Sequence, residues 1–366
     1  MEKIGILGGT FNPIHHGHLT VAEEVRCRLG LDYILLIPTG QPPHKTGAAF
    51  SEHRYLMTLL AAEGNPNLRV TRMEIDREGM SYTADTLRIL KEQTDAELYF
   101  IVGADEMNQI SSWRDADVLP SLCKWVAVTR PGHNIENALE IPAVDISSTE
   151  LRRRISEGQT IKYWLPEAVE RYITEVGFDE EFEKIHKPVK AKLSKKRYMH
   201  TLGVIETSLI LAARHGINMK KAYLAALLHD YAKELSDKEK RDACKKFGIK
   251  TDAVQEENIS LMHGQLSAEF AQIDFGITDA DVLKAVSYHS TGCVGMDSLG
   301  QLIKIADNIE PNRKHPDVEK IKTAANKDLR QGAIMSIERD IQYNIDKGKK
   351  IHHWSPDALE YLRRLV

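Results

Sequence analysis

The chain has 366 residues and a formal net charge of −4, from 49 Lys and Arg against 53 Asp and Glu. Its 42% apolar and 28% charged residues are typical of a globular protein and exclude a disordered or collagen-like chain. The balanced charge argues against nucleic acid as a partner held by bulk electrostatics. No segment approaches the roughly 20 apolar residues that cross a bilayer, so we expect a cytoplasmic protein with no membrane partner. The length predicts about two domains.

Up to about residue 180, short β-branched segments alternate with segments of helical apolar spacing. We expect strands at residues 3–8, 33–37, 68–71, 97–102 and 125–129, and helices at 19–29, 52–62, 83–92 and 150–157. This alternation predicts an α/β domain with a doubly wound, Rossmann-like parallel sheet. In such a sheet, ligands bind at the carboxyl ends of the strands.

After Gly177 the chain becomes strongly charged and strand candidates are lacking. Helical periodicity continues over residues 202–214, 220–233, 265–273, 281–288, 299–309 and 328–346. We therefore expect an all-α second domain, with the domains spanning 1–183 and 184–366. Four cysteines lie far apart, with no CxxC pair, which predicts reduced residues in the core: Cys27, Cys123, Cys244 and Cys293. The sequence contains no heptad repeat, so it gives no indication of the oligomeric state.

The first strand runs directly into the segment GGTFNPIHHGHL at residues 8–19. Gly8 and Gly9 allow a tight turn and a close approach of the backbone to a phosphate, and the next helix would point its positive end at the same place. The segment lacks the lysine of a P-loop and the third glycine of a dinucleotide fingerprint. It carries His15 and His18 instead, at the start of the predicted helix.

A second candidate phosphate site is ISSTELRRRI at residues 146–155. Ser147, Ser148 and Thr149 can cap a helix and offer hydroxyl and N–H groups to a polyphosphate, and Arg152 on the first turn can neutralise its charge. A serine cluster alone is usually only a cap. Two such helix starts, one at each end of a single α/β domain, indicate phosphate binding rather than two simple caps.

The segment GTFNPIHHGH resembles the GxFxPxHxGH signature of the nucleotidyltransferase superfamily, and ISSTELRRRI resembles its ISSTxxR motif. Further segments resemble nicotinate-nucleotide adenylyltransferases: PPHK at 42–45, HRY at 53–55, SYTADTL at 81–87, IVGADE at 101–106, Trp113 and RPG at 130–132. The resemblance implies adenylyl transfer from ATP to nicotinate mononucleotide with Mg²⁺. The acceptor phosphate is largely ionised at neutral pH, so catalysis requires positioning and charge neutralisation rather than a general base.

Within this resemblance we assign His15 and His18 to the ATP phosphates, Lys45 to the reacting phosphates, and Ser148 with Arg152 to the departing pyrophosphate. The resemblance also places Gly103 and Asp105 at the adenosine ribose. It places Thr83 and Trp113 around the nicotinate ring, although Trp113 fits a place in the core equally well. The remaining ATP-binding candidates are Gly8, Gly9, Thr10, Phe11, Ser147 and Thr149.

The second half carries histidines and carboxylates on or beside segments of helical apolar pattern. They are His200, the adjacent pair His229 and Asp230, His263, His289 and Asp307. An unpaired imidazole or carboxylate is costly to bury, and a shared metal would remove that cost. The other histidines are expected at the surface, namely His186, His215, His315, His352 and His353.

The order of these residues resembles the HD-domain metal-dependent phosphohydrolases. The segments RYMH, HDYAK, HG, YHSTG and ADNIEPNR resemble the bacterial symmetrical diadenosine tetraphosphate hydrolases. Four imidazoles and two carboxylates fit a di-metal centre bridged by Asp230. Mixed ligation suits iron, which we favour, or manganese or cobalt. The metals would activate a water for attack on an internal phosphorus, releasing ADP, with Lys233 and Arg313 as phosphate partners.

Two alternatives remain open. The first half could adenylate or cytidylate a different phosphate ester, with the second half acting as a broader nucleotide phosphohydrolase. The PPHK and SYTADTL segments argue against this for the first half. In a non-enzymatic alternative, the helical half is a metal-stabilised regulatory or oligomerisation module, which would bind metal without turnover.

Overall fold

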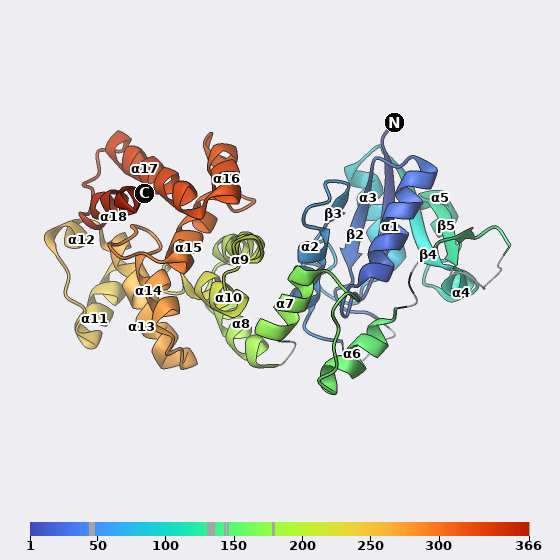
Figure 1. The fold of residues 1–366 in the computed structure, drawn as a ribbon, viewed down its shortest axis with the longest axis horizontal. Coiled ribbons are helices and arrows are strands. Elements are labelled where there is room, and N and C mark those ends of the chain that lie inside the picture. The colour runs from blue at the N-terminus through green and yellow to red at the C-terminus, as the bar shows by residue number, and fades with distance from the viewer. Residues whose placement is uncertain (44–47, 130–135, 143, 145, 178–179, 366) are drawn as a thin grey trace. The chain divides into compact units, whose positions relative to one another are not determined.

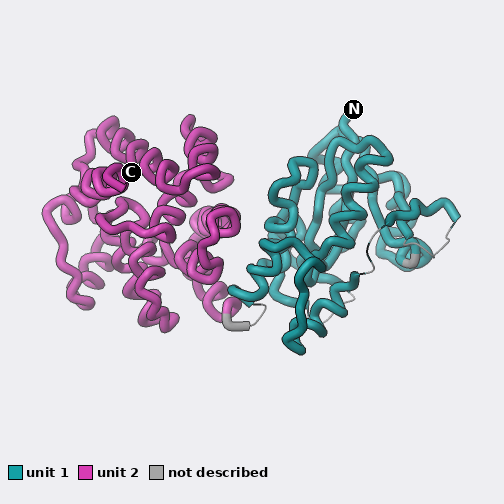
Figure 2. The backbone as a smooth tube through the Cα atoms, in the orientation of Figure 1, with its two compact units in different colours: residues 1–178 teal, residues 179–366 magenta. Residues whose placement is uncertain are grey.

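The computed structural model describes the chain except for residues 44–47, 130–135, 143, 145, 178–179 and 366. The chain divides into two compact units, residues 1–178 and 179–366 (Figure 2). The first is α/β and the second is helical, which confirms the expected fold classes. No helix in the described ranges has the length and apolar character needed to span a membrane.

Unit 1 is built on a six-stranded sheet in which every pair of neighbouring strands is parallel. The strands are β1 (Lys3–Gly9), β2 (Tyr33–Pro38), β3 (Leu68–Val70), β4 (Glu97–Gly103), β5 (Lys124–Thr129) and β6 (Leu139–Glu140). Their spatial order is β3-β2-β1-β4-β5-β6. The order reverses between β1 and β4, which defines the ligand-binding crevice of a doubly wound sheet at the carboxyl ends of these two strands.

Helices pack on both faces of this sheet (Figure 1). They are α1 (His16–Leu29), α2 (Ser51–Ala62), α3 (Thr83–Gln93), α4 (Ala104–Met107), α5 (Leu119–Leu122), α6 (Ser148–Ser156) and α7 (Glu167–Glu175), with a 3₁₀ turn η1 (Ile110–Ser112). On one face, Ile4 and Ile6 of β1 pack with Leu87 of α3 and Leu119 of α5. Successive residues of a strand therefore point to opposite faces of the sheet. Because helices cover both faces, both sets of side chains are apolar, which agrees with the near-continuous apolar sequence of the strands.

In the described residues of unit 2, every regular element is a helix, and the helices are joined by turns and loops. Its elements are α8 (Glu180–Lys192), α9 (Lys195–His215), α10 (Met219–Leu228), α11 (Asp237–Phe247), α12 (Ala253–Glu257), η2 (Ile259–Met262), α13 (His263–Phe275), α14 (Ala280–Tyr288), α15 (Ser298–Ile309), α16 (Val318–Lys327), α17 (Leu329–Asp346) and α18 (Trp354–Arg364). Helices α9, α10, α13, α14, α15 and α17 pack against one another and form its centre.

The expected strands and longer helices of unit 1 are present within a few residues, but some elements were not anticipated. The strand β6 has only two residues, and α11 carries too few apolar side chains to show a clear stripe. The helix expected over residues 220–233 ends at Leu228. His229 and Asp230 therefore lie beyond the regular helix, where their side chains can turn inward.

Three expectations about surface and core are wrong. His186 and His352 are buried rather than at the surface, at 1% and 2% exposure. His186 lies between the hydroxyls of Tyr223 and Tyr198, at 2.8 and 2.6 Å, so hydrogen bonds satisfy both ring nitrogens. Cys27 is exposed rather than in the core. All four cysteines are free, in agreement with the expected reduced state.

Candidate functional sites

The glycine turn follows β1 directly. Gly8 and Gly9 are the last residues of the strand, at the carboxyl edge where the strand order reverses. A Cβ on Gly9 would lie 2.9 Å from Cε1 of the Phe11 ring, so the turn has no room for a side chain there. Phe11 is buried with a left-handed φ of 46°, and its ring packs edge-on against His18. The backbone of this turn is thus held close to the α1 N-terminus.

His15 and His18 lie together at the N-terminus of α1. His15 is the N-cap residue, and its backbone N–H donates to Nδ1 of His18 at 3.3 Å. The two ring centroids are 3.8 Å apart. His15 is 4% exposed, and His18 is half-buried. The positive end of the α1 dipole and the two imidazoles therefore face one place, as the motif predicts.

Helix α6 docks on the loop that connects β1 to α1. Ser147 caps α6 by accepting from the N–H of Glu150 at 3.2 Å. Ser148 Oγ donates to the carbonyl oxygen of Pro13 at 2.9 Å, and Arg152 Nη1 donates to that of Asn12 at 2.8 Å. Two helix N-termini from opposite ends of the domain sequence thus meet beside the glycine turn, where their dipoles can act on one polyphosphate.

Arg54 of α2 is a site residue to which the sequence analysis assigned no role. Its guanidinium is 1% exposed and donates to the carbonyl oxygens of Ala49, Thr10 and Gly40 at 3.0, 2.8 and 2.8 Å. Burial lowers its pKa to about 10. Arg54 thereby connects the glycine turn to the loop after β2. The available signal was a charged residue within the otherwise apolar segment 53–62, which indicates a buried, fully hydrogen-bonded side chain.

Three further candidates of unit 1 lie within the described residues: Thr83, Gly103 and Trp113. Thr83 is the first residue of α3, and Gly103 ends β4 at the crevice. Trp113 is half-buried and packs edge-on against Phe100 and Trp125, at centroid distances of 6.3 and 6.1 Å. Trp113 therefore has packing contacts whether or not it binds a ligand. Lys45 and the side chain of Asp105 lie outside the described residues.

The six candidate metal ligands of unit 2 come together at its centre. His200 lies on α9, His229 and Asp230 directly follow α10, His263 begins α13, His289 follows α14, and Asp307 lies on α15. His229, Asp230, His263 and His289 are each at most 3% exposed. The structure thus brings together residues from five helices and helix ends.

The backbone orients three of the imidazoles. Nδ1 of His229, His263 and His289 lies 2.7, 2.5 and 2.8 Å from the carbonyl oxygen three residues earlier. A carbonyl oxygen only accepts, so each Nδ1 carries a proton, and each Nε2 carries a lone pair when the ring is neutral, as in a metal ligand. These lone pairs converge: His263 Nε2 is 2.9 Å from His289 Nε2, and His229 Nε2 is 3.3 Å from His200 Nε2. Converging lone pairs repel unless a cation lies between them, so this donor set fits metal ions.

The two oxygens of Asp230 face two different ligand groups. Oδ1 lies 3.1 Å from His263 Nε2 and 3.6 Å from His289 Nε2. Oδ2 lies 3.4 Å from His229 Nε2 and 3.6 Å from His200 Nε2. Each group of three offers ligand atoms within 4.8 Å of one another. Although burial opposes ionisation, His229 and Lys233 hold the pKa of Asp230 well below its ordinary value. A bridging carboxylate between two cations fits this arrangement.

Two carboxylates flank His200. Its Nε2 is 3.1 Å from Asp307 Oδ1, and its Nδ1 is 3.1 Å from Glu310 Oε1. Glu310 is 2% exposed, and a Cβ on Gly203 would lie 2.5 Å from Glu310 Oε2, so glycine is needed there for the carboxylate to approach α9. Glu310 was not assigned from the sequence, although it lies within the quoted segment ADNIEPNR. Such a partner orients an imidazole for metal binding.

Three cationic side chains surround these carboxylates. Arg197 Nη1 is 2.7 Å from Asp230 Oδ2, and Arg313 Nη2 is 2.6 Å from Asp307 Oδ1. Lys233 Nζ is 3.2 Å from His263 Nε2, and burial lowers its pKa. Lys233 and Arg313 were predicted as phosphate partners, whereas Arg197 was not. All three present positive charge beside the candidate metal centre.

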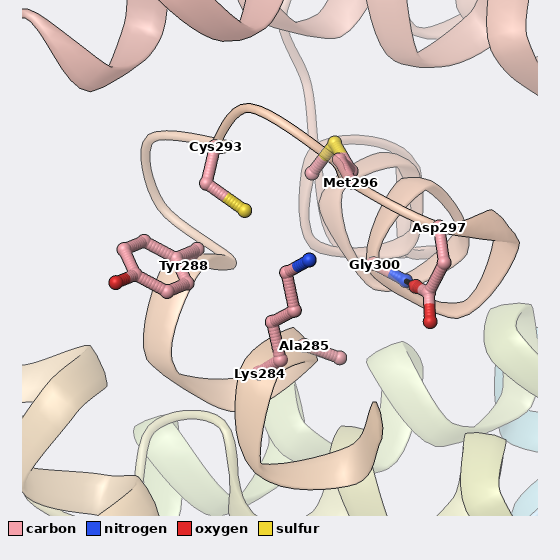
Figure 3. Close-up of a pocket in the computed structure, with 7 residues that line it drawn as sticks. All are labelled: Lys284, Ala285, Tyr288, Cys293, Met296, Asp297 and Gly300. Atoms are coloured by element: carbon pink, nitrogen blue, oxygen red, sulfur yellow. Dashed lines mark hydrogen bonds between the residues drawn. The ribbon is translucent and has the colours of Figure 1, made fainter. Parts of the chain in front are cut away.

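A pocket next to this centre has a different lining. It lies between the end of α14 and the start of α15, lined by Lys284, Ala285, Tyr288, Cys293, Met296, Asp297 and Gly300 (Figure 3). Lys284 Nζ donates to the carbonyl oxygen of Gly295 at 2.7 Å. None of the predicted ligands lines this pocket.

Comparisons with known proteins agree with this division. Residues 6–154 match the family model described as cytidylyltransferase-like, and residues 197–312 match that of the HD domain. The fold and the two sites thus define a nucleotidyltransferase domain joined to an HD domain. A probable nicotinate-nucleotide adenylyltransferase of Paenarthrobacter aurescens (strain TC1) is 48% identical over 181 residues, covering 47% of this chain and 88% of that protein. The chain belongs, through its first unit, to the nicotinate-nucleotide adenylyltransferase family.

Two further matches each cover about half of the chain. A probable nicotinate-nucleotide adenylyltransferase of Thermoanaerobacter sp. (strain X514) is 45% identical over 194 residues, covering 47% of this chain and 91% of that protein. A crystal structure of a predicted HD superfamily hydrolase involved in NAD metabolism from Clostridium acetobutylicum is 36% identical. It covers 50% of this chain and 98% of that chain, with a TM-score of 0.49.

Proposed function

We propose that unit 1 transfers the adenylyl group of ATP to nicotinate mononucleotide, forming nicotinate adenine dinucleotide and pyrophosphate in NAD biosynthesis. The observation that carries the proposal is the docking of α6 on the Asn12–Pro13 backbone by Ser148 and Arg152. This contact puts a second anion-binding helix start beside the glycine turn. The identity to adenylyltransferases over nearly the whole unit supports the choice of reaction.

In this reaction the protein positions two phosphate groups and neutralises their charge. His15, His18 and the α1 N-terminus bind the ATP phosphates, and Lys45 binds the reacting phosphates. Ser148 and Arg152 hold the departing pyrophosphate. Mg²⁺, when bound, would supply further charge neutralisation on the phosphate oxygens. Because the acceptor phosphate is already ionised, none of these residues has to remove a proton from it.

We place the acceptor and adenosine subsites at the crevice between β1 and β4, on the residues that the family resemblance assigns. Gly103, the last residue of β4, and Asp105 bind the adenosine ribose, and Thr83 and Trp113 border the nicotinate ring. The test compares nicotinate mononucleotide, nicotinamide mononucleotide and phosphopantetheine as acceptors, with pyrophosphate release as the readout. Preference for nicotinate mononucleotide supports the proposal. Preference for phosphopantetheine would replace it with a different adenylyltransferase activity.

We further propose that unit 2 is a metal-dependent hydrolase that cleaves diadenosine tetraphosphate symmetrically to two ADP. The observation that carries this proposal is the convergence of imidazole lone pairs on the two oxygens of Asp230. The residues that would hold two cations are His200, His229, Asp230, His263, His289 and Asp307. Iron is favoured for this mixed donor set, with manganese or cobalt as alternatives. Bound divalent cations would supply a water of lowered pKa.

The chain's own cations bind the substrate in this proposal. Three cations lie beside the carboxylates: Arg197, Lys233 and Arg313. When metals neutralise Asp230 and Asp307, these cations can pair with the phosphate oxygens of a polyphosphate. A polyphosphate with a nucleoside at each end would present its central phosphates to the metals.

We place the protein in the cytoplasm. Both proposed substrates are nucleotides, and the four free cysteines suit a reducing compartment.

The test for unit 2 uses the full chain with iron, manganese or cobalt added separately. ADP release from diadenosine tetraphosphate is measured, with Asp230→Ala as the negative control. ADP release that depends on Asp230 supports the proposal. Metal binding without turnover of this or other nucleotides would indicate a metal-stabilised module instead. Faster release of phosphate from mononucleotides would indicate a broader phosphohydrolase.

A further inference from the structure

Ser290, the residue after His289, lies at one of the two ligand groups. Its Oγ is 3.2 Å from His289 Nε2 and 3.3 Å from His263 Nε2. Both nitrogens carry lone pairs, so the hydroxyl can donate to only one of them at a time. Once a cation takes both lone pairs, the hydroxyl loses these acceptors. It would then be available to bond another group held by that cation.

A buried ammonium holds Ser290 in this position. Lys304 of α15 is 1% exposed, and its Nζ donates to the carbonyl oxygen of Ser290 at 2.7 Å. The charge of Lys304 is paired with Asp340 of α17, which also accepts from Asn308 Nδ2 at 3.2 Å and from Arg339 Nη1 at 2.8 Å. Burying an ammonium is costly unless it is fully paired. These contacts connect α15 and α17 to the backbone of Ser290.

We propose that Ser290 orients the water that the cation at His263 and His289 activates, and that Lys304 is a positioning residue for Ser290. This inference rests on the proposed hydrolase function. The hydroxyl donates a hydrogen bond to the oxygen of that water. A donor stabilises the deprotonated form of the water more than the neutral form, so it lowers the pKa of the water. Loss of Ser290 therefore raises that pKa.

The test uses the full chain loaded with Co²⁺ alone, which reports on its own ligands through visible absorption. Wild type is compared with Ser290→Ala, Ser290→Thr and Lys304→Met. Ser287→Ala is the matched control, because Ser287 Oγ donates to the carbonyl oxygen of Leu283 at 2.8 Å, within the same helix. Three quantities are measured: bound Co²⁺ per chain, the pH titration of the absorption, and the acid limb of the hydrolysis rate.

We expect equal bound Co²⁺ in all variants. Ser290→Ala and Lys304→Met should shift the titration upward by about one pH unit, the size expected for loss of one hydrogen bond. Ser290→Thr and Ser287→Ala should titrate like wild type. A Ser290→Ala titration equal to wild type overturns the proposal, and so does loss of Co²⁺ from that variant, which indicates a purely structural role. The absorption needs no turnover, so it tests Ser290 even if diadenosine tetraphosphate is not the substrate.

Discussion

Arg152 Nη1 donates to the carbonyl oxygen of Asn12 at 2.8 Å, across 140 residues of sequence. Together with the Ser148 contact to Pro13, this bond places the α6 N-terminus beside the glycine turn. Asn12 and Pro13 lie between the glycines and the two histidines of α1. The relative position of the two phosphate-binding segments thus depends on a small number of side-chain to backbone contacts.

Replacement of Arg152 tests this relationship. We expect Arg152→Ala to lower kcat/KM for adenylyl transfer by about 100-fold, because both a phosphate partner and the docking contact are lost. Arg153→Ala is the matched control on the same helix, since Arg153 is exposed and its side chain bonds, among the described residues, to its neighbours Glu150, Glu157 and Gln159. Steady-state kinetics on both variants decides the matter. An equal loss of kcat/KM in the two variants would mean that the effect comes from the stability of α6.

His15 and His18 of the motif are expected to bind phosphate, whereas His16, which lies between them in the sequence, is not. We expect His18→Ala to reduce adenylyl transfer by about 100-fold or more, because a group facing the ATP phosphates is lost. His16→Ala should stay near wild type, since the backbone N–H of His16, not its ring, bonds to Trp164. Circular dichroism should show the same fold for both variants. Near-wild-type activity of His18→Ala would contradict its assignment.

Arg54 is expected to stabilise unit 1. Arg54→Leu leaves the carbonyl oxygens of Thr10, Gly40 and Ala49 without their charged donor, which should lower the free energy of unfolding by about 3 kcal/mol. Arg114→Leu, at an exposed position, should change it by less than about 0.5 kcal/mol. Denaturant unfolding followed by tryptophan fluorescence reports mainly on unit 1, which holds three of the four tryptophans. Equal unfolding midpoints would refute this role.

Glu310 is expected to tune the metal centre through His200. We expect Glu310→Gln to weaken metal affinity by about 10–100-fold, because the carboxylate that orients His200 Nδ1 loses its charge. Glu360→Gln, on the exposed face of α18, is the control and should bind metal like wild type. Competition with a chelator measures the affinity of the full chain. Unchanged affinity in Glu310→Gln would show that Asp307 and the backbone suffice to orient His200.

Adenylyl transfer is expected to survive removal of the metal centre in unit 2. Asp230→Ala should abolish ADP release, since it removes the carboxylate facing both ligand groups. The same variant should keep pyrophosphate release from ATP and nicotinate mononucleotide within about twofold of wild type, because independent sites behave additively. Both assays, ADP release and pyrophosphate release, are run on the same preparation, so each one shows that the protein used in the other is folded. A parallel loss of both activities would mean that the sites are coupled.

The sequence alone determined the fold classes, five of the six strands that the structure describes in unit 1, and the motifs. Apolar periodicity is a local property, and the motif residues are adjacent in the chain, so both are readable without coordinates. It did not reveal the roles of Arg54, Arg197 and Glu310. A buried charged residue is distinguished from an exposed one by partners that are distant in the chain, and apolar spacing carries no information about them.

Only the tertiary structure decided how the motifs combine. The bonds from α6 to Asn12 and Pro13 join segments about 140 residues apart, and the two faces of Asp230 become distinct only when α9, α13 and α14 surround it. The protonated nitrogens of His229 and His289 likewise follow from the carbonyl three residues earlier, which is free to accept because α10 and α14 end there. The sequence determined which groups are present, and packing decided where their lone pairs and charges point.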